Sequence, residues 1–262
     1  MKEKFVTVNR NNIRYLEDGQ SDRNLILLHG LGGYAERWSA LMPHLNKKYH
    51  VFAPDLIGYG QSDKPSVDYT PEFFIKFVFD FMQTLGIKKT LMIGTSLGGQ
   101  ITAECAATQN AIIEKIILIS PAGIMRKSTP TLDAYTMAAL YPNYDSVKNA
   151  YQMMIGQDKQ VSEISIERFV TNMSRPNAKM VFLSTLLGLK NAPDIFEKLG
   201  KINIPTLVIW GKDDKLIPFE YAQQFVSSIK NCDFIPMEGC GHSPYVEDPS
   251  KLADVIIKFF AK

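Results

Sequence analysis

The stretch "MIGTSLGGQ" at residues 92–100 decides the expected fold, because it places one serine between two glycines at the end of an apolar run. A strand that turns abruptly into a helix forces the residue at the bend into a left-handed backbone conformation. Side chains two residues before and after that bend would collide, and Gly94 and Gly98 have no Cβ to collide. The pattern therefore predicts that Ser96 occupies a sharp strand-to-helix turn, with its hydroxyl open to substrate and to a base. An ordinary glycine-rich turn would explain the motif taken alone, so its context has to decide.

Strand-like and helix-like segments alternate along most of the chain. We expect strands at 5–8, 13–16, 24–29, 49–53, 90–93, 116–120, 206–210 and 233–236, and helices at 35–45, 71–85, 97–108, 219–229 and 249–260. Strands that are apolar on both faces are typical of a parallel sheet covered by helices on each side. The sequence thus predicts an α/β fold with a mostly parallel central sheet of about eight strands, helices on both faces and a leading antiparallel hairpin at the edge.

One interval breaks this alternation. Residues 125–200 show no strand pattern, and their helix-like segments are separated by prolines at 130, 142, 176 and 193. We therefore predict a helical cap, or lid, at 125–200, inserted between the sixth and seventh strands of a core domain formed by 1–124 and 201–262. The interval holds 6 of the 11 methionines and 4 of the 11 tyrosines. These side chains either pack among themselves or cover a pocket, and both interpretations are kept.

Composition limits the classes of partner. The chain has 262 residues, 45% of them hydrophobic, and a formal net charge of +2 without any long run of basic residues. No nucleic-acid partner is expected, and no apolar stretch approaches the roughly 18 residues of a membrane span. Cys105, Cys232 and Cys240 are odd in number and lack metal-ligand spacing, so we expect reduced thiols, no metal and a cytoplasmic protein. A homodimer is left open.

A serine hydroxyl becomes a good nucleophile only when a base accepts its proton. The chain offers four histidines, at 29, 44, 50 and 242. Those at 44 and 50 fit surface or packing positions. His242 lies in "EGCGHSPYVEDP", residues 238–249, directly after the last expected strand. Active sites of parallel sheets lie at the carboxyl ends of the strands, so His242 is the candidate base for Ser96.

The base needs a carboxylate that fixes its tautomer and stabilises its charged form. The stretch "WGKDDKLIP", residues 210–218, follows the penultimate strand and offers two aspartates. Asp214 is the first choice and Asp213 the alternative, although an acidic turn that caps the next helix would also explain one of them. The chain order Ser96, Asp214, His242 fits a nucleophile, acid and base brought together by folding.

Acyl transfer builds negative charge on the carbonyl oxygen, which requires preorganised N–H donors. The backbone N–H of Leu97, at the start of the helix after the serine, is one candidate donor. The glycine-rich stretch "HGLGG" at 29–33 supplies the other, with the N–H of Leu31 as first choice and that of Gly32 as second. His29 is then interpreted as a structural anchor of this loop.

These motifs together resemble those of the α/β-hydrolase superfamily over essentially the whole chain. The resemblance is to the branch that contains carboxylesterases, haloalkane dehalogenases, epoxide hydrolases and meta-cleavage-product hydrolases, and it rests on "HGLGG", "PDLIGYGQSDKP", "GTSLGGQ", "WGKDDKLIP" and "GHSPYVEDP". It implies a serine-dependent carboxylic ester hydrolase that acts through an acyl-enzyme on small to medium apolar esters, without cofactor or metal. It also implies that the loop at 54–65 is structural, so no catalytic role is assigned to Asp55 or Asp63.

The nucleophile narrows the chemistry within this branch. Dehalogenases and epoxide hydrolases of this fold use a carboxylate where this chain has Ser96. Meta-cleavage-product hydrolases use serine, but they usually carry asparagine before it and tryptophan after the histidine, where this chain has Thr95 and Ser243. Arg175 either mimics the arginine with which those enzymes hold an acidic substrate or is a surface residue. Carbon–carbon bond hydrolysis and a triad-retaining ligand-binding receptor are therefore kept as alternatives.

Overall fold

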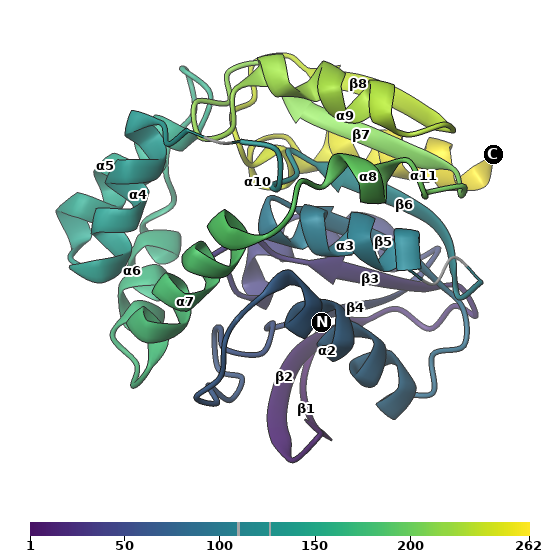
Figure 1. The fold of residues 1–262 in the computed structure, drawn as a ribbon, viewed down its shortest axis with the longest axis horizontal. Helices are drawn as coiled ribbons and strands as arrows, with labels where there is room; N and C mark the ends of the chain where they lie inside the picture. Colours follow the sequence, from purple (N-terminus) through teal and green to yellow (C-terminus); the bar gives the residue numbers. More distant parts are fainter. Residues whose placement is uncertain (109–110, 126) are drawn as a thin grey trace.

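The computed structural model describes residues 1–108, 111–125 and 127–262, in which eight strands form one central sheet (Figure 1). The strands are β1 (Lys2–Val8), β2 (Asn11–Asp18), β3 (Asn24–Leu28), β4 (His50–Pro54), β5 (Thr90–Thr95), β6 (Ile113–Ile119), β7 (Thr206–Gly211) and β8 (Cys232–Met237). Their spatial order is β1-β2-β4-β3-β5-β6-β7-β8. The β1–β2 and β2–β4 pairs are antiparallel and all later pairs are parallel, which confirms the predicted sheet.

Helices cover both faces of the sheet because both faces are apolar. One face packs against α2 (Pro71–Thr84), α3 (Leu97–Thr108), α8 (Phe196–Leu199) and α9 (Ala222–Ser228), and the other against η1 (Ala35–Trp38), α1 (Met42–Leu45), α10 (Pro244–Glu247) and α11 (Pro249–Ala261). Consecutive residues of β5 contribute to opposite sides: Leu91 and Ile93 join one apolar cluster, and Met92 joins the other. This alternation explains why the parallel strands read as continuous apolar runs.

Two expected helices were wrong in detail. The helix expected at 35–45 is a 3₁₀ turn, η1, followed by the separate short helix α1. Pro43 explains the interruption, because proline has no N–H to continue the helical hydrogen bonds and is favoured in a first turn. The helix expected at 219–229 begins as the 3₁₀ turn η2 (Phe219–Tyr221) before α9. The other predicted elements differ from the observed ones by a few residues at their ends.

Between β6 and β7 the described residues form helices and no strand. They are α4 (Pro130–Leu140), α5 (Tyr144–Met154), α6 (Glu163–Met173), α7 (Ala178–Asn191) and α8. We call α4–α7 the helical insertion; Figure 1 shows these four helices grouped together beyond the sheet, whereas α8 packs on α3 and α9. Proline begins α4, whose N-cap Thr129 accepts a hydrogen bond from the N–H of Leu132. The division into a core domain and a cap stays a prediction.

Two further features bear on the expectations from composition. The three cysteines are free thiols, two of them buried. Within 1–108, 111–125 and 127–262, the helices are too short or too polar to cross a membrane.

Candidate active site

Ser96 lies at the turn from β5 into α3, in the conformation that the glycine pattern predicts. Its φ is +53°, in the left-handed region that is costly for a residue with a side chain. A Cβ on Gly94 would lie 2.1 Å from the carbonyl oxygen of Gly98, and one on Gly98 would lie 2.2 Å from that of Leu28. Both contacts are far too short, so the two glycines are required by the close approach of the backbone on either side of the serine.

His242 and Asp214 form a buried pair at the ends of β7 and β8. The Nδ1 of His242 donates to Oδ2 of Asp214 at 2.7 Å, and the two residues are 3% and 4% exposed. The other oxygen, Oδ1, accepts from the backbone N–H groups of Leu216 and Ile217, each at 2.9 Å. Asp214 therefore orients the imidazole with Nδ1 protonated, which leaves Nε2 free to accept a proton.

The alternative acid is placed differently. Asp213 is half-buried, and its backbone N–H donates to the carbonyl of Cys240 at 2.9 Å. Its carboxylate makes no hydrogen bond to His242 in the described part of the chain, so of the two neighbouring aspartates the fold brings Asp214 to the histidine.

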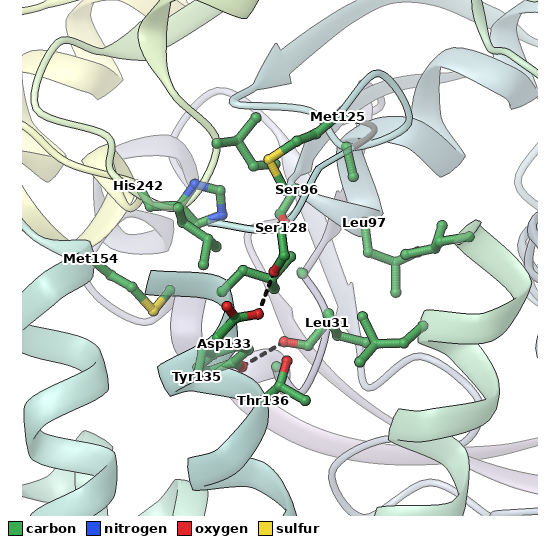
Figure 2. A pocket seen from close by; sticks show the side chains of 18 of the residues that line it. Leu31, Ser96, Leu97, Met125, Ser128, Asp133, Tyr135, Thr136, Met154 and His242 are labelled. Carbon is green, nitrogen blue, oxygen red and sulfur yellow. Dashed lines mark hydrogen bonds between the residues drawn. The ribbon is translucent and has the colours of Figure 1, made fainter. Parts of the chain in front are cut away.

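Ser96 and His242 line one cavity of about 570 Å³ (Figure 2). Figure 2 shows the imidazole and the serine side chain facing the same space, with the helical insertion on its other side. No hydrogen bond joins Ser96 Oγ to His242 among the described residues, and such contacts commonly tighten only when substrate binds. The insertion contributes a largely apolar wall, formed by Leu132, Tyr135, Thr136, Tyr151, Met154, Leu183, Leu186, Leu187 and Leu189.

The glycine-rich loop at 29–33 approaches the serine closely. A Cβ on Gly30 would lie 3.0 Å from Ser96 Cβ, and the Gly33 N–H closes a turn by donating to the Gly30 carbonyl at 3.0 Å. The hydroxyl of Tyr135 donates to the Leu31 carbonyl at 2.7 Å and so holds the Leu31–Gly32 peptide in place from the insertion. Figure 2 shows this bond below the serine.

The expected oxyanion donors are left available by this arrangement. In the described part of the chain, neither the N–H of Leu31 nor that of Leu97 donates a hydrogen bond to a protein group. Leu97 is also the first residue of α3, where helix N–H groups have no partner within the helix. The assignment of Leu31, Leu97 and the second choice Gly32 to an oxyanion hole stays a prediction.

His29 anchors the glycine-rich loop to its neighbour at 54–65. Its Nδ1 donates to the Gly30 carbonyl at 2.8 Å, and its Nε2 accepts from the Leu56 N–H at 2.9 Å. Accepting at Nε2 requires the neutral ring, and burial accordingly lowers the pKa of His29 to about 4. The interpretation of His29 as a structural anchor fits these contacts.

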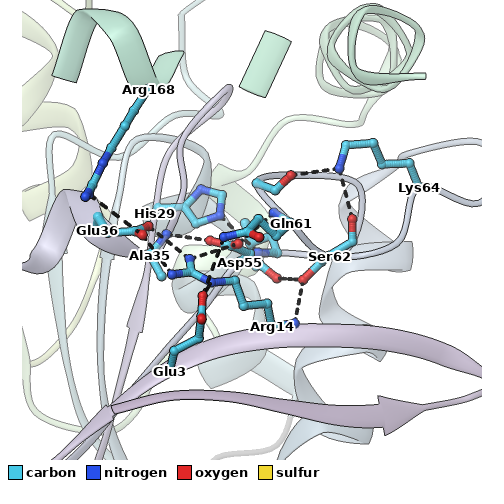
Figure 3. Close-up of polar contacts among 12 residues, drawn as sticks. Glu3, Arg14, His29, Ala35, Glu36, Asp55, Gln61, Ser62, Lys64 and Arg168 are labelled. Atoms are coloured by element: carbon cyan, nitrogen blue, oxygen red, sulfur yellow. Dashed lines mark hydrogen bonds and ion pairs between the residues drawn. The ribbon is translucent and has the colours of Figure 1, made fainter. Parts of the chain in front are cut away.

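The loop at 54–65 is held by a buried carboxylate (Figure 3). Asp55 is fully buried, accepts from the N–H groups of Ala35 at 2.6 Å and Gln61 at 2.8 Å, and pairs with Arg14 at 3.2 Å. Burial raises the pKa of Asp55 above its ordinary value even though the Arg14 guanidinium opposes this shift. Neither Asp55 nor Asp63 lines the cavity, in agreement with the structural role implied for this loop.

A carboxylate that the sequence did not single out ties the histidine loop to the insertion. Glu247 Oε2 accepts from the N–H groups of Gly241 and Gly156, each at 2.8 Å, and Oε1 accepts from Ser243 at 2.9 Å. Two of these donors flank His242, and Gly156 follows α5 of the insertion. The sequence signal was weak: an acidic residue near the N-cap of the short helix α10 reaches back to the N-cap N–H.

The remaining histidines and Arg175 lie away from the cavity. His44 is exposed, and His50 Nε2 contacts Glu17 at 2.8 Å near the surface. Arg175 is exposed and does not line the cavity, as the surface interpretation predicts. No group of three or more His, Cys, Asp or Glu side chains among the described residues is arranged to hold a metal ion.

Comparison with known proteins supports the fold described above. A family model described as alpha/beta hydrolase fold matches residues 23–146, which include the glycine-rich loop and the serine turn. The chain has the α/β-hydrolase fold. The chain is 26% identical, over 99% of its length and 91% of the relative's, to the 2-hydroxy-6-oxo-6-(2'-aminophenyl)hexa-2,4-dienoic acid hydrolase of Metapseudomonas resinovorans.

Relatives with other reactions are similar to a comparable degree. Human monoacylglycerol lipase ABHD6 is 25% identical over 91% of this chain and 75% of the lipase. Among solved structures, a membrane phospholipase A described as a bacterial virulence factor superposes with a TM-score of 0.87 at 27% identity, covering 99% of this chain and 86% of that one. Carbon–carbon and ester hydrolases are thus both among its relatives.

Proposed function

We propose that this chain is a serine-dependent carboxylic ester hydrolase that cleaves small to medium apolar esters through an acyl-enzyme. The observation that carries the proposal is the buried hydrogen bond between His242 and Asp214. The same imidazole lines the cavity that Ser96 also lines. A serine in a strained turn, beside an imidazole with a fixed tautomer, is the arrangement that activates a hydroxyl for acyl transfer.

The reaction follows from the atoms that line the cavity. Ser96 Oγ attacks the ester carbonyl while His242 Nε2 accepts its proton, and Asp214 stabilises the imidazolium that forms. The backbone N–H groups of Leu31 and Leu97 stabilise the oxyanion, with Gly32 as the second choice for Leu31. His242 then protonates the leaving alcohol and activates the water that releases the acid.

The helical insertion serves as the cap in this proposal. Its side chains supply most of the apolar wall of the cavity, so they cover the acyl chain of the substrate. Tyr135 and Met154 line the cavity from α4 and α5, which supports the interpretation that part of the Met- and Tyr-rich interval faces a ligand.

Short p-nitrophenyl esters test the proposal. Steady multiple turnover is expected for the wild type, and Ser96→Ala is expected to abolish it. Asp214→Asn is expected to lower kcat by about 10³- to 10⁴-fold, by analogy with the serine-protease example of this substitution. Asp213→Asn serves as the matched control, because its carboxylate makes no hydrogen bond to His242 in the described part of the chain. A single burst followed by a stable adduct would favour a ligand-binding receptor instead.

Carbon–carbon bond hydrolysis is the second candidate function. It is favoured by the 26% identity, over nearly the whole chain, to a hydrolase of a 2-hydroxy-6-oxo-hexadienoic acid. It is disfavoured by Thr95 and Ser243, which stand where such enzymes usually have asparagine and tryptophan. Loss of the visible absorbance of a vinylogous diketone acid, faster than p-nitrophenyl ester turnover and dependent on Ser96, would establish this reaction in place of ester hydrolysis.

A further inference from the structure

A guanidinium group stands in the wall of the cavity that holds Ser96. Arg37, on the 3₁₀ turn η1, lines this cavity and also a smaller one of about 110 Å³. Tyr151, Met154 and Ser243 likewise line both spaces, so the two cavities adjoin at this point. Arg37 thus lies where the large apolar cavity meets a smaller one with several polar residues in its wall.

Among the described residues, this arginine has no carboxylate partner. No Asp or Glu oxygen of the described residues forms an ion pair with Arg37. The neighbouring Glu36 is engaged by Arg14 at 2.7 Å and Arg168 at 3.7 Å. Glu247, which lines the smaller cavity, already accepts three backbone N–H groups. The carboxylates of Glu36 and Glu247 are therefore committed elsewhere.

Aromatic rings and a hydroxyl hold the guanidinium in place instead. Its Cζ lies 5.4 Å from the ring centroid of Tyr151 and 5.7 Å from that of Tyr245. One Nη donates to Ser243 Oγ at 3.2 Å. A guanidinium has five N–H donors and stays protonated at any physiological pH, so donors remain for a further acceptor. Cation–π contacts fix the position of the charge without neutralising it.

The other charged side chains that line the cavity are also mostly positive. Lys127 and Lys190, both exposed, line it together with Arg37, and among the described lining residues the acidic one is Asp133, which accepts a hydrogen bond from Ser128. A positive cavity attracts an anionic ligand. The structure therefore has a preorganised place for one negative group at the end of an apolar space.

We propose that Arg37 binds a carboxylate of the substrate, so that the preferred esters carry an apolar acyl chain ending in an acidic group. Half-esters of dicarboxylic acids have this chemistry. The inference rests on the proposed ester hydrolysis and refines it: the acyl chain lies along the apolar wall, and its free carboxylate reaches the guanidinium. Recognition of a carboxylate by arginine is charge-assisted and commonly bidentate.

Matched pairs of esters test this inference. Monoethyl esters of dicarboxylic acids with four to eight carbons are compared with ethyl esters of monocarboxylic acids of equal length, and acid release is followed in a pH-stat. The readout is the kcat/KM for the acidic ester divided by that for the neutral one. We expect Arg37→Gln to lower this ratio about 10- to 100-fold, the range for loss of a charge-assisted hydrogen bond. Arg37→Lys, which keeps the charge but not the planar fork, is expected to lie between Arg37→Gln and wild type.

Arg175→Gln is the matched control, because it removes an exposed arginine outside the cavity and should leave the ratio unchanged. An equal ratio in wild type and Arg37→Gln would overturn the inference, as would loss of the preference in Arg175→Gln alone. Calorimetric titration of Ser96→Ala with monoethyl adipate separates the two proposals. Suppose that Ser96→Ala binds monoethyl adipate, that Ser96→Ala/Arg37→Gln does not, and that the wild type turns over no ester. This result would support the anion site and reject ester hydrolysis. No binding and no preference would reject the anion site.

Discussion

Replacing Glu247 tests whether the contact between the insertion and the histidine loop aligns the base. The carboxylate accepts three backbone N–H groups, two on Oε2 and one on Oε1. Glu247→Gln keeps one oxygen, which can retain the Gly156 and Gly241 donors, but it turns an amide donor toward the N–H of Ser243. One charge-assisted bond is lost, which is about 2 kcal/mol.

The position of this bond sets the expected effect on turnover. Ser243 follows His242 directly, and the His242 N–H donates to the Met154 carbonyl at 2.7 Å. Loosening Ser243 therefore moves the imidazole relative to Ser96. If the whole 2 kcal/mol appears as misalignment of the base, kcat falls about 30-fold while KM changes little. The same loss of free energy of unfolding lowers Tm by about 4–8 °C.

Ester turnover and thermal unfolding of the same preparations provide the assay. Glu238→Gln is the matched control: this glutamate lies in the same loop, is 66% exposed at its side chain and pairs with Lys212 at 2.6 Å. A surface pair of this kind contributes little, so kcat and Tm should stay near the wild-type values. Full kcat in Glu247→Gln together with the lower Tm would refute the reasoning, because Glu247 would then stabilise the fold without positioning His242.

Three further predictions concern the turn and the anchor. Gly98→Ala brings a Cβ to 2.2 Å from the Leu28 carbonyl oxygen and is expected to lower the free energy of unfolding in urea by about 3 kcal/mol or more. Gly200→Ala is the control: with φ −62° and the nearest atom 3.7 Å from its Cβ, it is expected to be near neutral. Ser96→Gly relieves the left-handed strain and should be about 1 kcal/mol more stable than Ser96→Ala, both being inactive. Burial lowers the pKa of His29 from 6.5 to about 4, so between these pH values the unfolded chain binds a proton that the folded chain does not. The free energy of unfolding is therefore highest above about pH 6.5 and falls by about 3 kcal/mol toward pH 4. His29→Gln should remove that part of the slope in urea midpoints measured against pH.

The sheet and the serine turn were predictable because their signals are local. Apolar runs on both faces and glycines two residues either side of Ser96 are read from neighbouring positions. The loops that carry Asp214 and His242 follow parallel strands, and the carboxyl ends of such strands meet at one edge. Strand order depended on packing and came from the structure. The sequence already favoured Asp214 over Asp213, and the structure adds the hydrogen bond that joins Asp214 to His242.

Residues that act through distant partners gave almost no signal. Glu247 gains its significance from Gly156, 91 residues away, and Arg37 from the ring of Tyr151 and the absence of a carboxylate partner in the described chain. An arginine in a short turn and a glutamate near the start of a helix are common in any sequence, so neither pattern by itself indicates a role at the site. The break between η1 and α1 was readable from Pro43, which the continuous helix expected at 35–45 did not take into account.

The helical insertion contacts the catalytic loops at more than one point, and this bears on how substrate binding acts. The Tyr135 hydroxyl donates to the Leu31 carbonyl in the loop expected to bind the oxyanion, and the backbone carbonyl of Met154 accepts from the N–H of His242. Both residues also line the cavity, so a ligand that contacts them contacts residues that position the oxyanion loop and the base. If the chain hydrolyses esters as proposed, we expect side chains of the insertion to influence kcat as well as substrate choice, because binding energy from the acyl chain would be transmitted to the groups that act on the ester.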